Sequence, residues 1–241
     1  MNDPKRDTTQ ITEELDNFIG SCDAAIWGYC DLSGITNRPF PELRNGISMG
    51  IKLNPKIVLS LKEGPGEEYT REYDEVNSRL AELAGKVSEF IKDLGYDACF
   101  IPPTQSLNDP EKLYAKFPHK TAATLSGLGW IGKNALLVTK KYGSALRIIT
   151  IFTDAPVTTG DPVVKSYCGD CDNCRDLCPP GAVLGVKWSQ GMSREELLNT
   201  RGCFEYSRKM GYEAGPGHGV CGRCIVVCPW TEKYLKREGV L

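Results

Sequence analysis

The chain has 241 residues, of which 41% are hydrophobic and 25% charged, so it can form one large domain or two modest ones. Its 29 basic and 31 acidic side chains give a formal net charge of -2, which excludes a global basic field that would attract nucleic acid. No apolar run reaches the length of a membrane span, and the first residues resemble neither a signal nor a transit peptide. We therefore expect a cytoplasmic protein without membrane association.

The first half of the chain alternates helical and extended patterns. A helix is predicted to open near Thr9, and residues 46–61 contain two apolar, β-branched segments, divided by Asn54 and Pro55, that are typical of strands. From Tyr73 the apolar positions recur every three or four residues until Gly95, which predicts one long amphipathic helix.

The following segments continue this mixture. Strands are predicted within 96–101, 134–139 and 144–154, with a helix over His119–Leu125. Together these elements predict an α+β fold with mixed layers around one sheet. Proline, glycine and threonine replace the apolar pattern over residues 153–164, so we expect a first domain over 1–160 and a second over 161–241.

The chain has eleven cysteines, and in the cytosol, where thiols are kept reduced, they do not form a disulfide framework. Cys22, Cys30 and Cys99 are scattered and are interpreted as small buried hydrophobic residues without a role. The other eight crowd the last third of the chain: Cys168, Cys171, Cys174, Cys178, Cys203, Cys221, Cys224 and Cys228.

Their spacing is that of two-cluster ferredoxins. CGDCDNCRDLCPP reads CxxCxxCxxxCP, and CGRCIVVCPW reads CxxCxxxCP; in such runs the last cysteine binds the other cluster. One 4Fe-4S cluster is thus predicted on Cys168, Cys171, Cys174 and Cys228. The second takes Cys178, Cys221 and Cys224, and Cys203 is the cysteine left to complete it. A zinc site is the alternative, although zinc favours two pairs of ligands over runs of three and four.

A glycine-rich segment, SGLGWIGKNALL, lies between the predicted helix and the next strand. Its spacing suits a backbone pressed against a flat or anionic ligand, while a tight turn that packs a core tryptophan would look similar. The candidate ligand-binding residues are Gly127, Gly129, Trp130, Gly132, Lys133 and Asn134.

From HKTAATLSGLGWIGK to CGRCIVVCPW, the order and spacing of these motifs resemble the epoxyqueuosine reductase family, to which reductive dehalogenases are related. The resemblance implies a nitroreductase-like, cobalamin-binding domain followed by a bacterial ferredoxin-like domain with two 4Fe-4S clusters. It implies an oxidoreductase whose clusters reduce cobalamin, held in part by the glycine-rich segment, with electrons from a low-potential donor such as a ferredoxin or flavodoxin.

The same resemblance guides the expected substrate and partners. Family members that act on tRNA carry a C-terminal helical-repeat extension and a basic face, whereas this chain ends at Leu241 and is slightly acidic. We therefore expect a small molecule or nucleoside as substrate rather than tRNA. Two alternatives remain, namely a corrinoid-handling protein that reduces or activates cobalamin for a partner, and an FMN-dependent reductase.

The proton donor of such a reductase is also open. The family's proposed donor is an aspartate in a segment for which this chain reads FIPPTQSLNDPEKL. We favour His119, because an imidazole titrates near neutral pH, although a capping or surface histidine would look the same. The catalytic candidates are His119, Lys120 and Tyr73, with Asp74, Asp109 and Glu111 as further donors.

Overall fold

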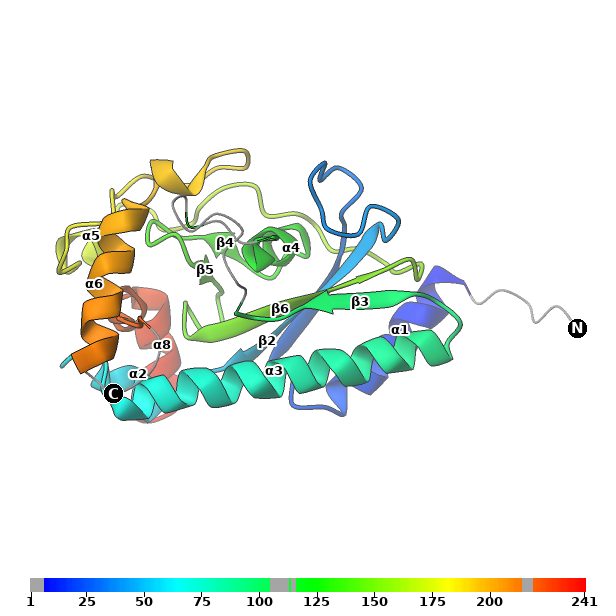
Figure 1. Cartoon of the computed structure of the whole chain (residues 1–241), viewed down its shortest axis with the longest axis horizontal. Coiled ribbons are helices and arrows are strands. Elements are labelled where there is room, and N and C mark those ends of the chain that lie inside the picture. The colour runs from blue at the N-terminus through cyan, green and yellow to red at the C-terminus, as the bar shows by residue number, and fades with distance from the viewer. Residues whose placement is uncertain (1–6, 105–112, 114–115, 214–218) are drawn as a thin grey trace, which may run out of the picture. The chain divides into compact units, whose positions relative to one another are not determined.

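The computed structural model describes residues 7–104, 113, 116–213 and 219–241, which fall into two compact units (Figure 1). The first comprises Met1–Ile51, Asn77–Leu128 and Ile148–Val163, and the second comprises Lys52–Val76, Gly129–Arg147 and Val164–Leu241. The last change of unit falls inside the predicted linker, yet two earlier segments also belong to the second unit. Functional domains over 1–160 and 161–241 stay a prediction.

A four-stranded sheet forms the centre of the first unit. Its order is β1 (Ile26–Asp31), β2 (Asn45–Lys52), β6 (Leu146–Thr153) and β3 (Ala98–Ile101). β1 runs antiparallel to β2, with Tyr29 opposite Ile47, and β3 runs antiparallel to β6. The α+β class is confirmed, and β1 is a strand that the sequence patterns did not predict.

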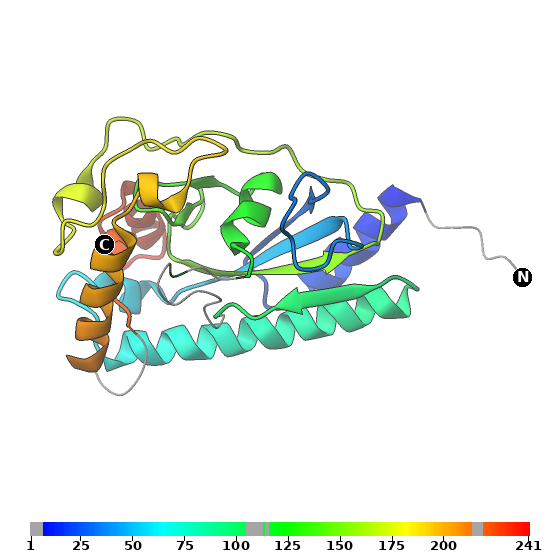
Figure 2. The same cartoon turned by 45° about the horizontal axis from the view of Figure 1, so that its top comes forward.

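Helices cover both faces of this sheet. α3 (Glu67–Asp93) lies along one face and α4 (His119–Leu125) along the other, as Figure 2 shows. α1 (Thr8–Gly20) starts at a capping box formed by Asp7, and its Phe18 stacks on Phe90 of α3 at 4.2 Å between ring centroids.

The long predicted helix is confirmed as α3, but it begins six residues before Tyr73. Glu67 and Glu68 occupy its first turn, where negative charge interacts favourably with the helix dipole. Past its C-terminal end, Gly95 adopts φ +91°, a conformation that favours glycine and stops the helix.

One predicted strand is wrong. The apolar segment after Pro55 forms a helix, α2 (Pro55–Ser60), because the Asn54 side chain accepts a hydrogen bond from the Lys56 N–H and Pro55 fits the first helical position. Within the segment 134–139, β5 (Leu137–Val138) pairs with β4 (Trp130–Ile131) in a separate two-stranded sheet, and Thr139 forms an isolated bridge with Gly143. The expectation of a single sheet is therefore corrected as well.

The remaining elements belong to the second unit, and all except α6 are short. They are α5 (Asn173–Asp176), the 3-10 helix η1 (Arg194–Glu196), α6 (Thr200–Glu213), α7 (Arg223–Val226) and α8 (Pro229–Arg237). The Tyr234 hydroxyl of α8 donates a 2.7 Å hydrogen bond to the Leu53 carbonyl, which ties α8 to the chain just before α2. Segments distant in sequence thus build the second unit together.

The core of the first unit includes a cluster of buried side chains from the sheet, α4 and the segments next to them: Cys30, Leu32, Leu43, Ile101, Phe117, Ala122 and Phe152. Cys30 is fully buried, as expected of a structural cysteine, whereas Cys22 is partly exposed and Cys99 exposed. Within the described ranges, no helix combines the length and apolarity needed to cross a bilayer.

Candidate metal centre

Four cysteines line one cavity of about 90 Å³ in the second unit. Cys168 and Cys171 come from the turn that leads into α5, Cys174 lies within α5, and Cys228 is the N-cap residue of α8. Gly169, at φ +57°, lets the chain turn between the first two, and the Cys171 N–H donates a 3.3 Å hydrogen bond to the Cys168 carbonyl. The fold therefore brings together thiols from both cysteine runs.

These thiols influence one another electrostatically. Burial raises the pKa of Cys174 to about 12, with further contributions from Cys168, Cys228 and Cys171. Burial also raises the pKa of Cys228, and the nearby Cys168 and Cys171 raise it further. Cys174 and Cys228 therefore favour the protonated form, and a cationic centre beside them would stabilise their thiolates.

The other four cysteines form a second group. Burial raises the pKa of Cys203, and Cys178 and Cys221 raise it further. The pKa of Cys224 is well above its ordinary value because of burial, and then because of Cys221, Cys203, Cys174 and Cys178. In addition, the Ala182 N–H donates a 3.3 Å hydrogen bond to the Cys178 sulfur.

The four cysteines that line the cavity are those predicted for the first cluster, whereas the second ligand set stays a prediction, because the electrostatic influences on Cys224 also include Cys174. Thiolates are the ligands of iron–sulfur clusters, and four of them around one cavity fit a cluster. Within the described part of the chain, no three His, Cys, Asp or Glu residues are arranged to hold a single metal ion. Cluster binding itself stays a prediction.

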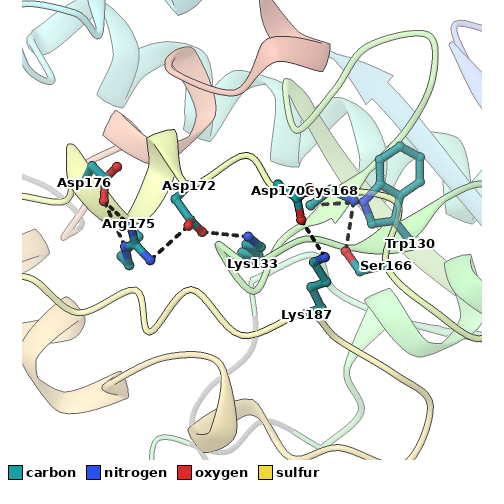
Figure 3. A network of polar contacts seen from close by, with 9 residues as sticks. All are labelled: Trp130, Lys133, Ser166, Cys168, Asp170, Asp172, Arg175, Asp176 and Lys187. Carbon is teal, nitrogen blue, oxygen red and sulfur yellow. Dashed lines mark hydrogen bonds and ion pairs between the residues drawn. The ribbon is translucent and has the colours of Figure 1, made fainter.

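Trp130, Lys133 and Asn134 of the glycine-rich segment face these cysteines. The Trp130 indole N–H donates a 3.4 Å hydrogen bond to the Cys168 sulfur, and the buried Lys133 ammonium donates a 2.6 Å bond to Asp172 (Figure 3). Asn134 lines the same cavity as Lys133. Trp130 and Lys133 thus contact the segment that carries the first three cysteines, while Asn134 lines their cavity and also bonds to Ser144 and to the Cys224 carbonyl oxygen.

The glycines of this segment are explained by packing. A Cβ on Gly129 would collide with the Val138 carbonyl, and one on Gly132 would lie 2.6 Å from the Asn134 Oδ1. Gly127 has φ +75°, and its Cβ would lie 2.8 Å from the Asp161 carbonyl oxygen. Trp130 is 1% exposed, as in a tight turn that packs a core tryptophan. These residues do not form a visible cradle for a corrinoid, and corrinoid binding by them stays a prediction.

His119 is buried in the first unit between two partners. Its Nε2 lies 3.1 Å from the Pro102 carbonyl oxygen and its Nδ1 lies 3.0 Å from the Thr150 hydroxyl. Because a carbonyl can only accept, Nε2 carries a hydrogen and donates it to Pro102. Both ring nitrogens are thus engaged inside the protein.

The other catalytic candidates are distributed over the chain. Tyr73 belongs to the second unit, where the Arg147 guanidinium lies 4.1 Å from its ring centroid, whereas Lys120 belongs to the first unit beside His119. Asp109 and Glu111 lie outside the described residues. A catalytic role for any of these side chains stays a prediction.

Several residues near the cysteines were missed by sequence reasoning. The Ser166 hydroxyl accepts a 3.3 Å hydrogen bond from the Cys168 N–H, and Asp172 pairs with Lys133 and Arg175. The buried ring of Tyr69 would lie 3.2 Å from a Cβ on Gly222. Asp172 could have been found, because it lies inside the CxxC spacing, but Ser166 and Tyr69 carry no recognisable signal.

Sequence comparisons relate the chain to two groups of reductases. No family model matches it. It is 30% identical over 165 residues to the epoxyqueuosine reductase of Pseudomonas aeruginosa, covering 65% of this chain and 40% of that protein. It is 28% identical over 170 residues to the tetrachloroethene reductive dehalogenase of Dehalobacter restrictus, covering 64% of this chain and 28% of that protein. The chain thus spans well under two thirds of either relative.

The same two groups share its fold. A reductive dehalogenase described as B12-dependent superposes with a TM-score of 0.74 at 18% identity, over 98% of this chain and 34% of its own. An epoxyqueuosine reductase bound to a tRNA stem loop superposes with a TM-score of 0.64 at 18% identity, over 92% and 66%. Together with the cysteine motifs, these matches show that the chain is a homologue of the epoxyqueuosine reductases and the reductive dehalogenases.

Proposed function

We propose that this chain is an iron–sulfur and corrinoid-dependent reductase resembling epoxyqueuosine reductase. The observation that carries the proposal is the convergence of Cys168, Cys171, Cys174 and Cys228 on one cavity, with the remaining four cysteines grouped in the same unit. Eight thiolates in two groups of four suit two 4Fe-4S clusters in a ferredoxin-like domain.

The side chains of the second unit would hold and shield these clusters. The four cysteines of the cavity would bind the first cluster, and Cys178, Cys203, Cys221 and Cys224 the second. Pro229, Trp230 and Val138 line the first cavity, so they would limit the access of water to the sulfurs. When bound, the clusters supply one-electron transfer and a corrinoid supplies a reducible cobalt centre.

The corrinoid part of the proposal rests on the relatives. One reductive dehalogenase of the same fold is described as B12-dependent, and the nitroreductase-like, cobalamin-binding character of the first domain is proposed by analogy with it. Trp130, Lys133 and Asn134 already contact the cysteine site. The proposal that this chain binds a corrinoid therefore does not require these three side chains to contact it.

The substrate and partners are proposed on charge and resemblance. With 29 basic against 31 acidic side chains, the chain has no excess positive charge for a nucleic-acid backbone, which favours a small molecule or nucleoside over tRNA. A ferredoxin or flavodoxin would serve as the low-potential electron donor. A corrinoid protein is the partner if the chain activates cobalamin for another enzyme.

Anaerobic purification tests the cofactors. Two clusters require about eight iron and eight sulfide per chain, and the absorption spectrum after addition of hydroxocobalamin should show bound corrinoid. Stoichiometric zinc without iron would refute the cluster proposal. If the protein instead shows the absorption spectrum of bound FMN and binds no corrinoid, the corrinoid proposal is refuted and the FMN-dependent reductase is favoured.

Turnover then tests the activity. Reduction of epoxyqueuosine nucleoside by the reduced, corrinoid-loaded protein would support a reductase of that substrate class. Reduction of bound cobalamin without turnover of this nucleoside, but with activation of an added corrinoid protein, would identify the corrinoid-handling alternative.

A further inference from the structure

The Trp130 indole is held against the first group of cysteines by its surroundings. β4 pairs Trp130 with Val138, and the rings of Tyr167 and Trp230 approach it edge-on at 5.4 and 5.2 Å between centroids. The side chain is 1% exposed, so its orientation is fixed by packing rather than by solvent.

This orientation aims a hydrogen-bond donor at a sulfur atom. A buried indole N–H requires an acceptor, and Trp130 Nε1 lies 3.4 Å from Cys168 Sγ (Figure 3). On the backbone side, the Cys168 N–H donates to the Ser166 hydroxyl at 3.3 Å. Cys168 is therefore positioned at both its backbone and its sulfur.

We infer that Trp130 is a positioning residue that donates a hydrogen bond to the Cys168 thiolate and thereby raises the reduction potential of the first cluster. The inference rests on the proposed function, because it requires a cluster on Cys168. Reduction adds negative charge to a cluster and its thiolates, so a hydrogen bond to a ligand sulfur is stronger in the reduced state. Removing that donor should make reduction less favourable.

The test is a potentiometric titration of the iron-loaded protein followed by electron paramagnetic resonance. Trp130→Phe keeps an aromatic ring in the packing but removes the N–H donor. Trp188→Phe is the matched control, because Trp188 is likewise buried in the same unit, at 6% exposed, while the donor to the Cys168 sulfur is Trp130. The signal of the first cluster is identified as the one that survives in Cys203→Ser.

We expect the first cluster's potential to become more negative in Trp130→Phe, and both potentials to be unchanged in Trp188→Phe. The second cluster should keep its potential in both variants. An unchanged first potential in an iron-replete Trp130→Phe protein, or an equal shift in the control, would overturn the inference.

A variant that fails to assemble would still leave a decisive measurement. Replacing Trp130 by its benzothienyl analogue, in which sulfur takes the place of the indole N–H, keeps the shape and removes the donor. The same negative shift is expected there, and its absence would overturn the inference. Wild-type protein without iron and sulfide would instead refute the proposed function, and the inference with it.

Discussion

The side-chain amide of Asn134 donates a 3.2 Å hydrogen bond to the carbonyl oxygen of Cys224, 90 positions later in the chain. The same amide donates to the Ser144 hydroxyl at 3.2 Å, and its Oδ1 accepts from the Leu136 N–H at 3.2 Å. Asn134 is 4% exposed; its bond to Ser144 is buried and the other two bonds are partly buried. One side chain thus connects the turn between β4 and β5 to the second cysteine run.

We expect Asn134→Ala to lower the free energy of unfolding by about 1–3 kcal/mol, because buried partners lose their hydrogen bonds. Urea unfolding of the iron-loaded protein under anaerobic conditions measures the loss. Ser144→Ala, which leaves the bond to Cys224 in place, should have a smaller effect. Equal stabilities of wild type and Asn134→Ala would show that the bond to Cys224 contributes nothing.

The ligand assignment predicts that single cysteine variants damage different clusters. Cys228→Ser should chiefly affect the cluster of Cys168, Cys171 and Cys174, because Cys228 lines their cavity. Cys203→Ser should chiefly affect the cluster of Cys178, Cys221 and Cys224. Iron and sulfide analysis with spectra of the reduced proteins would distinguish them. Loss of the same signal in both folded variants would contradict the assignment.

The proximity of Cys168, Cys171 and Cys174 was predictable because it depends on local spacing. CxxCxxC places three thiols on one short turn whatever surrounds it, and the helices over His119–Leu125 and the long α3 follow from periodicity alone. The α+β class followed from the same patterns. These features are encoded within short stretches of the chain.

The features that were missed have two causes, a local cap in one case and contacts between distant segments in the other. The Asn54 cap and Pro55 outweighed a β-branched run, so α2 replaced a predicted strand. The orientation of Trp130, Lys133 and Asn134 toward the cysteines depends on pairing between β4 and β5 and on packing against residues more than thirty positions away. Sequence reasoning could find the glycine-rich segment but not the side to which it turns.

Two glycine substitutions test whether packing explains the glycines of the segment SGLGWIGKNALL. Gly129→Ala places a Cβ against the Val138 carbonyl, which backbone pairing holds in position, so we expect a loss of more than about 2 kcal/mol. Gly85→Ala in α3 meets no heavy atom within 4 Å and should stabilise the chain by about 0.5–1 kcal/mol. Thermal unfolding of both variants measures the contrast. A tolerated Gly129→Ala would reopen the ligand-facing interpretation of the segment.

The charge balance predicts weak binding to tRNA. Affinity for a phosphate backbone comes from clustered basic side chains that release counterions, and this chain has a formal net charge of -2. We expect no submicromolar complex with tRNA in a filter-binding assay at physiological salt. Tight binding that weakens steeply as salt rises would contradict this and favour a tRNA substrate.

His119 can have a structural role, a catalytic role or both, and two variants distinguish these roles. Its ring nitrogens contact the Pro102 carbonyl and the buried Thr150 hydroxyl, so His119→Ala should lower the free energy of unfolding by about 2–3 kcal/mol. If His119 is the proton donor, His119→Ala also keeps both clusters and bound corrinoid but loses turnover or changes its pH dependence.

His119→Gln separates structure from catalysis. Glutamine can still donate to a carbonyl and accept from a hydroxyl, but its amide does not titrate near neutral pH and cannot serve as a general acid. Because both nitrogens are engaged inside the first unit, we expect His119→Gln to recover part of the stability and to retain turnover of whatever substrate the wild type reduces. Urea unfolding and a pH–rate profile on the same preparations provide the comparison. Restored stability without turnover would establish His119 as the proton donor after all.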